Sequence, residues 1–193
     1  MRRLFLAIPI KNEDNGFRPL LEGLRRRLSH EKEINWANPE QTHLTLKFIG
    51  HTGEDDLQRI IEAVDETLAS HKPFDIDFNK VGIFGSHYAP RVIWLGMNEQ
   101  PQQLIDLEED ILNAFDKIGF LRDRQNFVPH LTLGRIRRLC EKAYFQKVIQ
   151  NVEPKTYIAQ TVNKITLYQS FLNPNGAHHK ALKSWNLELF AAR

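Results

Sequence analysis

The chain has 193 residues and a hydrophobic fraction of 41%, which is ordinary for a globular protein with a core. Its 26 basic and 24 acidic residues leave a formal charge of +2, so bulk charge is too weak to argue for nucleic-acid binding, and any affinity for RNA must come from a local site. The one cysteine, Cys140, excludes an internal disulfide framework and suits a reducing cytoplasm; we expect this side chain to be partly buried.

Strand-like and helix-like segments alternate through the first half of the chain. The apolar run at 4–9 predicts a buried first strand, because it is too short for the core of a signal peptide. Apolar residues at helical spacing predict an amphipathic helix over about 15–30 and another after 52–55. Alternation and β-branched or aromatic content predict strands at 43–50, 74–78 and 90–96.

The second half continues in the same way. A helix is expected from about Pro101 to Gly119, then a strand at 130–136, a short helix near 140–150 and two strands at about 161–172 and 180–190. Residues 173–176 read as the turn between those two strands. The elements are mixed without a strict strand–helix–strand rhythm, which predicts an α+β fold with antiparallel or mixed sheets. No apolar stretch approaches the roughly 20 residues that cross a membrane, so a soluble, cytoplasmic protein is expected.

One tetrapeptide occurs twice. The sequence His-Leu-Thr-Leu stands at 43–46 and again at 130–133, 87 residues later, each time on an expected strand after a loop that contains proline. Because residues i and i+2 of a strand share a face, His43 and Thr45 point to one side while the leucines point to the core, and His130 and Thr132 do the same. A lone strand histidine is usually structural, but two His-x-Thr units with identical neighbours indicate a paired site.

The residue types suit acid–base chemistry at phosphorus. A free imidazole has a pKa of about 6.5, so one ring can be neutral and the other protonated near neutral pH. One ring then takes a proton from an attacking water while the other donates a proton to the leaving oxygen. The neighbouring threonine hydroxyls can donate to phosphate oxygens, and the opening of a strained five-membered cyclic phosphate would need no metal.

The two motifs resemble the hallmark of the two-histidine (2H) phosphoesterases, which carry two copies of His-x-Ser/Thr-x. Within them the chain is similar to the RNA 2′,3′-cyclic phosphodiesterases, historically called 2′-5′ RNA ligases, and the similarity extends to the runs at 3–8, 90–96, 127–130 and 165–170. The resemblance implies one bilobal domain over 1–193. In it, two antiparallel or mixed sheets with pseudo-twofold symmetry flank a central cleft, and the helices lie outside.

The same resemblance implies an activity and roles. The expected reaction is hydrolysis of an RNA terminal 2′,3′-cyclic phosphate to a 2′-phosphate, without a metal or other cofactor, with ATP-independent 2′-5′ ligation as its reverse. His43 would be the proton donor and His130 the proton acceptor, roles that the residues alone do not assign. Thr45 and Thr132 would bind phosphate. The expected partners are RNA ends, with tRNA halves among the candidates. The enzyme is expected to be a monomer.

Phe48 and Arg135 present a conflict. The family suggests that these two residues hold the terminal nucleoside, and each stands five positions after its motif histidine. Simple alternation puts position +5 on the leucine face of the strand, away from the site. Either the strands twist or bulge near their ends, or these two residues are structural. By the same alternation Lys47 shares the face of His43, as a solvated rim residue, and His178 and His179 are expected in an exposed turn.

The residues leave other functions open. A metal-dependent hydrolase would need three or more ligands at suitable spacing, and neither motif has a matching Asp, Glu or Cys nearby. An ATP-dependent ligase would need a phosphate-binding loop, which the sequence lacks. A small cyclic phosphate such as an ADP-ribose cyclic phosphate is an alternative substrate. A catalytically silent RNA-end binder is the alternative outside enzymes, although both histidines and both threonines are present.

Overall fold

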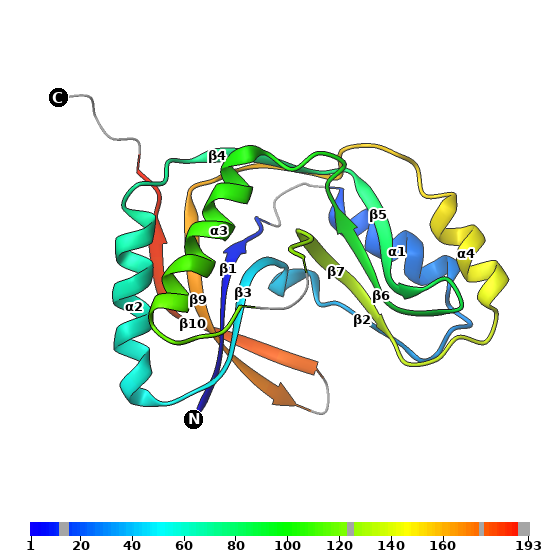
Figure 1. The fold of residues 1–193 in the computed structure, drawn as a ribbon. Coiled ribbons are helices and arrows are strands. Elements are labelled where there is room, and N and C mark those ends of the chain that lie inside the picture. The colour runs from blue at the N-terminus through cyan, green and yellow to red at the C-terminus, as the bar shows by residue number, and fades with distance from the viewer. Residues whose placement is uncertain (12–15, 123–125, 174–175, 189–193) are drawn as a thin grey trace.

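The computed structural model describes residues 1–11, 16–122, 126–173 and 176–188 (Figure 1). Its helices are α1 (Phe17–Arg27), α2 (Glu54–Leu68), α3 (Gln102–Lys117), α4 (Lys142–Gln150) and a short 3₁₀ helix, η1 (Pro39–Gln41). Its strands are β1 (Arg2–Pro9), β2 (Ile34–Trp36), β3 (His43–Thr52), β4 (Phe74–Phe78), β5 (Lys80–Ser86), β6 (Ala89–Gly96), β7 (His130–Ile136), β8 (Ile158–Val162), β9 (Lys164–Asn173) and β10 (Gly176–Asn186).

The strands form three sheets. The first sheet has the order β10-β9-β1-β3, the second sheet has the order β2-β7-β6-β5, and β4 pairs with β8. Every pairing among the described strands is antiparallel. Helices α2 and α3 pack on each other beside the first sheet, and α1 and α4 lie beside the second sheet at the other end of the molecule (Figure 1). The α+β fold predicted from the sequence is confirmed.

The first sheet shows why the motif strand is held rigidly. Strand β1 lies inside this sheet between β3 and β9, and its residues 4–8 are all buried. Leu4, Leu6 and Ile8 belong to the hydrophobic core that also takes Leu44 of β3 and the apolar stripe of α2. Burying one such side chain stabilises the fold by about 1.5–3 kcal/mol. The site therefore sits on strands that the core fixes from behind.

Several details differ from the sequence-based expectation. Strands β2 and β5 were not predicted, and the strand expected over 161–172 is two strands that break at Asn163, whose carbonyl accepts the N–H of Leu187. Cys140 is exposed rather than partly buried, and its backbone N–H donates to the buried carboxylate of Glu31. The strand expected over 180–190 is β10, which begins at Gly176 and ends at Asn186; residues 174–175 of the expected turn and 189–190 lie outside the described residues. None of the described helices is long and apolar enough to cross a bilayer.

Candidate active site

The two motifs come together although they lie on different sheets. His43 begins β3, at the edge of the first sheet, and His130 begins β7, inside the second sheet. Strands β3 and β7 contact each other, and the positive charges of His130 and Arg135 act on the His43 ring. The pairing of motifs predicted from the repeat is therefore present in the fold.

Each motif histidine has a fixed tautomer. The Nδ1 of His43 lies 2.8 Å from the carbonyl oxygen of Gln41, and the Nδ1 of His130 lies 2.8 Å from that of Val128. A carbonyl oxygen can only accept, so Nδ1 carries the proton and donates it in both rings. This leaves each Nε2 as the nitrogen that gains or loses a proton. In both motifs the partner carbonyl belongs to the second residue before the histidine, so the two units are built alike.

Both histidines favour their neutral form. Burial lowers the pKa of His43 below its ordinary value, and the charges of His130 and Arg135 lower it further, while the hydrogen bond to Gln41 acts in the opposite direction. Burial also lowers the pKa of His130, with a further contribution from Arg135 and an opposing one from the Val128 carbonyl. An anionic phosphate placed between the rings would favour their charged forms, so protonation would follow substrate binding.

The motif threonines are available to a ligand. Thr45 and Thr132 are partly exposed, and within the described part of the chain neither hydroxyl bonds another protein group. Each threonine follows its histidine by two residues on the same face of its strand. Two hydroxyl donors beside two imidazoles are a suitable set for the non-bridging oxygens of a phosphodiester.

A β-bulge resolves the position of Phe48. Along β1, Ala7 is paired with Thr45 but the next residue, Leu6, is paired with Lys47, so Leu46 is an extra residue in β3. The bulge shifts the alternation by one position, and Lys47 joins the leucines on the core side. Phe48 then pairs with Phe5 and returns to the side of His43; the Phe5 and Phe48 rings stack with centroids 5.8 Å apart.

Strand β7 has the same irregularity at the equivalent place. Trp94 is paired with Thr132 and Ile93 with Gly134, so Leu133 is the extra residue. Arg135 therefore returns to the face of His130 and Thr132, and its charge reaches both histidines. The expectation of strict alternation, which placed Phe48 and Arg135 on the leucine face, is wrong at these two positions. The bulge that follows each His-x-Thr unit places both on the site face.

Aromatic side chains that were not foreseen as part of the site surround His43. The ring centroid of Phe5 lies 4.8 Å from that of His43, and Tyr168 of β9 lies 6.2 Å away. His179 of β10 stands edge-on to His43 at 5.1 Å. His178 and His179 lie in strand β10 rather than in a turn; His178 is exposed as expected, but His179 is half-buried. Phe5 lies in the apolar run at 4–9, where it could not be told from a core residue.

His130 has a smaller aromatic neighbourhood. Phe84 of β5 meets the His130 ring edge-on at 4.7 Å, and Phe84 in turn packs on Trp94 of β6 at 5.3 Å. Trp94 is the cross-strand neighbour of Thr132 on the site face. Its indole ring lies over Gly82 and Gly96, where there is no side chain to obstruct it. The two glycines thus make room for the ring that supports the second motif.

Adding a methyl group under Trp94 should destabilise this half of the site. A Cβ at position 82 would lie against Trp94 more closely than real Cβ contacts come, so we expect Gly82→Ala to reduce the free energy of unfolding by about 1–3 kcal/mol. Urea denaturation measures the change. Gly23 of α1 is the matched control, because a Cβ there meets nothing within 4 Å and Gly23→Ala should stabilise the helix. An unchanged urea midpoint for Gly82→Ala would show that Trp94 moves freely.

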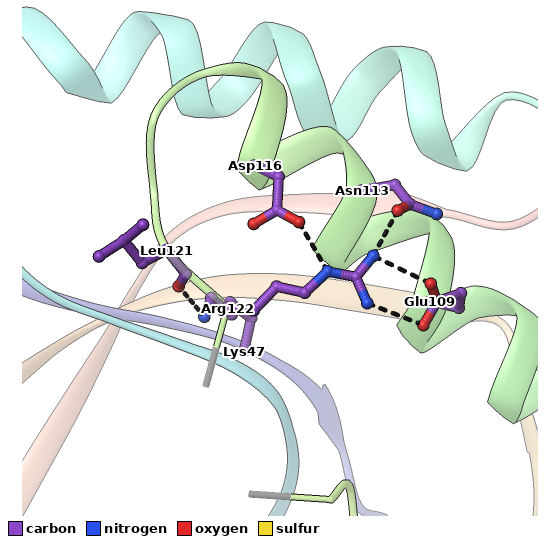
Figure 2. A network of polar contacts seen from close by, with 6 residues as sticks. All are labelled: Lys47, Glu109, Asn113, Asp116, Leu121 and Arg122. Carbon is purple, nitrogen blue, oxygen red and sulfur yellow. Dashed lines mark hydrogen bonds and ion pairs between the residues drawn. The ribbon is translucent and has the colours of Figure 1, made fainter. Parts of the chain in front are cut away.

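Lys47 is not a solvated rim residue. The bulge turns it to the core side, where it is buried, and its Nζ donates to the carbonyl oxygen of Leu121 at 2.9 Å (Figure 2). The next residue, Arg122, donates to Asp116 at 2.6 Å, to both oxygens of Glu109 and to Asn113, all on α3. These contacts join the first motif strand to the segment that leads toward His130.

Within the described residues, no group of three or more His, Cys, Asp or Glu side chains is placed to hold a metal ion. The functional set is instead two Nε2 atoms with fixed tautomers, two hydroxyls, one guanidinium and a row of aromatic rings. Such a set can exchange protons with a ligand and bind an anion beside a ring. This is the set of groups that a two-histidine acid–base site requires.

Comparison with known proteins agrees with this class of site. The model of the 2′-5′ RNA ligase superfamily matches residues 14–170. A protein of Methanothermobacter thermautotrophicus named RNA 2′,3′-cyclic phosphodiesterase is 32% identical over 96% of this chain and 98% of its own length. One of the same name from Archaeoglobus fulgidus is 32% identical over 94% of this chain and 98% of its own. The chain belongs to the 2′-5′ RNA ligase superfamily.

Solved structures show the same fold. E. coli LigT complexed with 3′-AMP superimposes with a TM-score of 0.75 at 23% identity, over 97% of this chain and 99% of that one. A protein of Thermus thermophilus gives a TM-score of 0.77 at 22% identity, over 96% of this chain and 97% of the other.

Proposed function

We propose that this chain hydrolyses the terminal 2′,3′-cyclic phosphate of RNA to a 2′-phosphate. The observation that carries the proposal is the identical construction of the two motifs. Each histidine has its Nδ1 proton held by a backbone carbonyl, each is followed by a threonine on the same face, and each strand bulges at the next residue. The names of the archaeal relatives support the same reaction.

The proposed reaction adds one water and needs no other reactant. His130 Nε2 takes a proton from water, and the water oxygen forms a bond to phosphorus. The bond from phosphorus to the 3′ oxygen breaks, and His43 Nε2 gives its proton to that oxygen. The product is a 2′-phosphate monoester with a free 3′ hydroxyl. Thr45 and Thr132 donate to the non-bridging oxygens, where negative charge grows in the transition state.

Phe48 and Arg135 are proposed to hold the terminal nucleoside. Phe48 is 45% exposed although it stacks on the buried ring of Phe5, so a flat apolar ring is presented on the site face. Arg135 is exposed on the facing strand and can stack on a base or pair with phosphate. An RNA 5′ hydroxyl in the place of water would give 2′-5′ ligation without ATP.

The setting of the reaction is part of the proposal. The single cysteine supports a reducing cytoplasm. We expect a monomer that acts on RNA ends such as tRNA halves.

The test is to incubate the purified protein with an oligoribonucleotide that ends in a 2′,3′-cyclic phosphate and to follow the product by phosphorus NMR. We expect the signal of the strained cyclic diester to be replaced by that of a 2′-monoester, with the same rate in excess chelator. A cyclic mononucleotide and an ADP-ribose cyclic phosphate serve as comparison substrates. Turnover of the ADP-ribose compound with none of the RNA end would contradict the RNA assignment, and binding of the RNA end without turnover would indicate a silent binder.

A further inference from the structure

The hairpin of β9 and β10 reaches the first motif from the far edge of its sheet. In the order β10-β9-β1-β3, strands β10 and β3 are at opposite edges. Nevertheless the ring of His179 lies 5.1 Å from that of His43, and His178 Nδ1 lies 3.2 Å from the side-chain nitrogen of Gln41. Side chains from the two edges of the first sheet therefore meet over Phe5, whose ring contacts both His43 and His179.

The rings around His43 restrict how it can turn. Phe5 is tilted by 36° to the His43 plane at 4.8 Å, whereas His179 stands at 86° to it at 5.1 Å. Tyr168 completes the enclosure at 6.2 Å. With Nδ1 held by the Gln41 carbonyl, rotation of the ring about its Cβ–Cγ bond would break a hydrogen bond and meet an aromatic wall. His130 lacks an equivalent enclosure, since Phe84 alone contacts its ring among the described aromatic pairs.

His179 contributes a ring and not a second acid. Burial lowers its pKa to about 4, and the charges of His43, His178 and Arg3 act in the same direction. Those three groups come from β3, β10 and β1, and the phenol of Tyr168 on β9 is uncharged near neutral pH. The Nδ1 of His179 is buried and has no hydrogen-bond partner within the described residues, so substrate cannot reach that atom. The contact between the two rings is the packing of an uncharged His179 ring against His43.

We propose that His179 is a positioning residue for His43, closing the aromatic enclosure that holds the imidazole in the orientation set by the Gln41 carbonyl. The inference rests on the proposed function insofar as His43 is the proton donor. It assigns to the β9–β10 hairpin a part in the acid–base chemistry that neither motif contains.

The test compares two substitutions at one position. His179→Ala removes one ring of the aromatic enclosure. The His43 ring can then rotate more freely and is more exposed to water. We expect kcat for the cyclic-phosphate RNA end to fall about tenfold with little change in KM, since misplacement of a catalytic group costs rate rather than binding. His179→Phe keeps a ring of similar shape, so we expect kcat within about twofold of the parent. It should also raise the melting temperature, because a buried nitrogen without a partner is removed.

A second readout does not depend on catalysis. The Cε1 proton of His43, assigned by its loss in His43→Ala, reports the pKa of that ring by NMR titration. In His179→Ala this pKa should rise toward its ordinary value, because burial is the largest cause of its depression, whereas in His179→Phe it should stay low. Lys180→Ala is the control: Lys180 is the exposed next residue of β10 and its side chain points to the other face.

The outcomes separate cleanly. An unchanged His43 titration and an unchanged kcat in His179→Ala would overturn the positioning role. Equal impairment of His179→Phe and His179→Ala would also overturn it, because the imidazole itself would then be required. If the parent does not hydrolyse the RNA end at all, the proposed function fails, while the His43 titration still decides whether His179 positions that ring.

Discussion

Alanine in place of His43 or His130 should lower the rate of cyclic-phosphate hydrolysis by about 10²- to 10⁴-fold, because each substitution removes one of the two proton transfers. The double variant should be only slightly slower than either single variant, since the two rings act as one unit. Rates with the cyclic-phosphate oligonucleotide measure the effect. His87→Ala is the matched control, because His87 is an exposed histidine in the turn between β5 and β6. Substantial activity in either single variant would contradict the acid–base pair.

The same variants can assign the acid and the base. A cyclic substrate with sulfur in place of the leaving 3′ oxygen releases a thiolate, which needs no proton. We expect that substrate to restore turnover by His43→Ala, which lacks the proposed donor, and to leave His130→Ala inactive, because activation of water is still missing. Restoration of His130→Ala instead would reverse the two roles.

The sequence predicted the motif pair because its signal is local. Two His-x-Thr units with leucines between them need only strand periodicity to place two histidines and two threonines on one kind of face. The helices were predicted for the same reason, since α1, α2 and α3 each carry a regular apolar stripe. The pseudo-twofold relation between the two halves, the division into domains and the roles of the site residues stay predictions.

The features that the sequence did not predict depend on pairing between segments that are distant in the chain. The bulges at Leu46 and Leu133 exist only relative to β1 and β6, so alternation within one strand could not reveal that Phe48 and Arg135 face the site. Strand β5 contains two glycines, which weaken a strand pattern, yet Gly82 is needed where Trp94 crosses it. His179 reaches His43 from the opposite edge of the first sheet, and no spacing in the sequence encodes that contact.

Arg135 should control the pH dependence as well as the rate. Its charge lowers the pKa of both His43 and His130, in addition to the larger effect of burial. Both limbs of the kcat/KM profile, which report the free enzyme, are therefore expected below the ordinary imidazole value of about 6.5. Arg135→Met removes a positive charge that disfavours imidazolium, so both limbs should move to higher pH. Loss of this cation beside the phosphate should also lower kcat/KM by about 10²-fold.

Two further variants define what Arg135 does. Arg135→Lys keeps the charge, so its limbs should stay near those of the parent. It loses the planar guanidinium, so KM should rise if that plane stacks on the terminal base. Arg137→Met is the control for charge alone, because Arg137 is exposed just beyond β7 and acts on neither histidine. If Arg135→Met left both limbs of the kcat/KM profile in place, the charge of Arg135 would not act on the His43 and His130 rings. Arg135 would then lie on the site face only to bind the nucleoside.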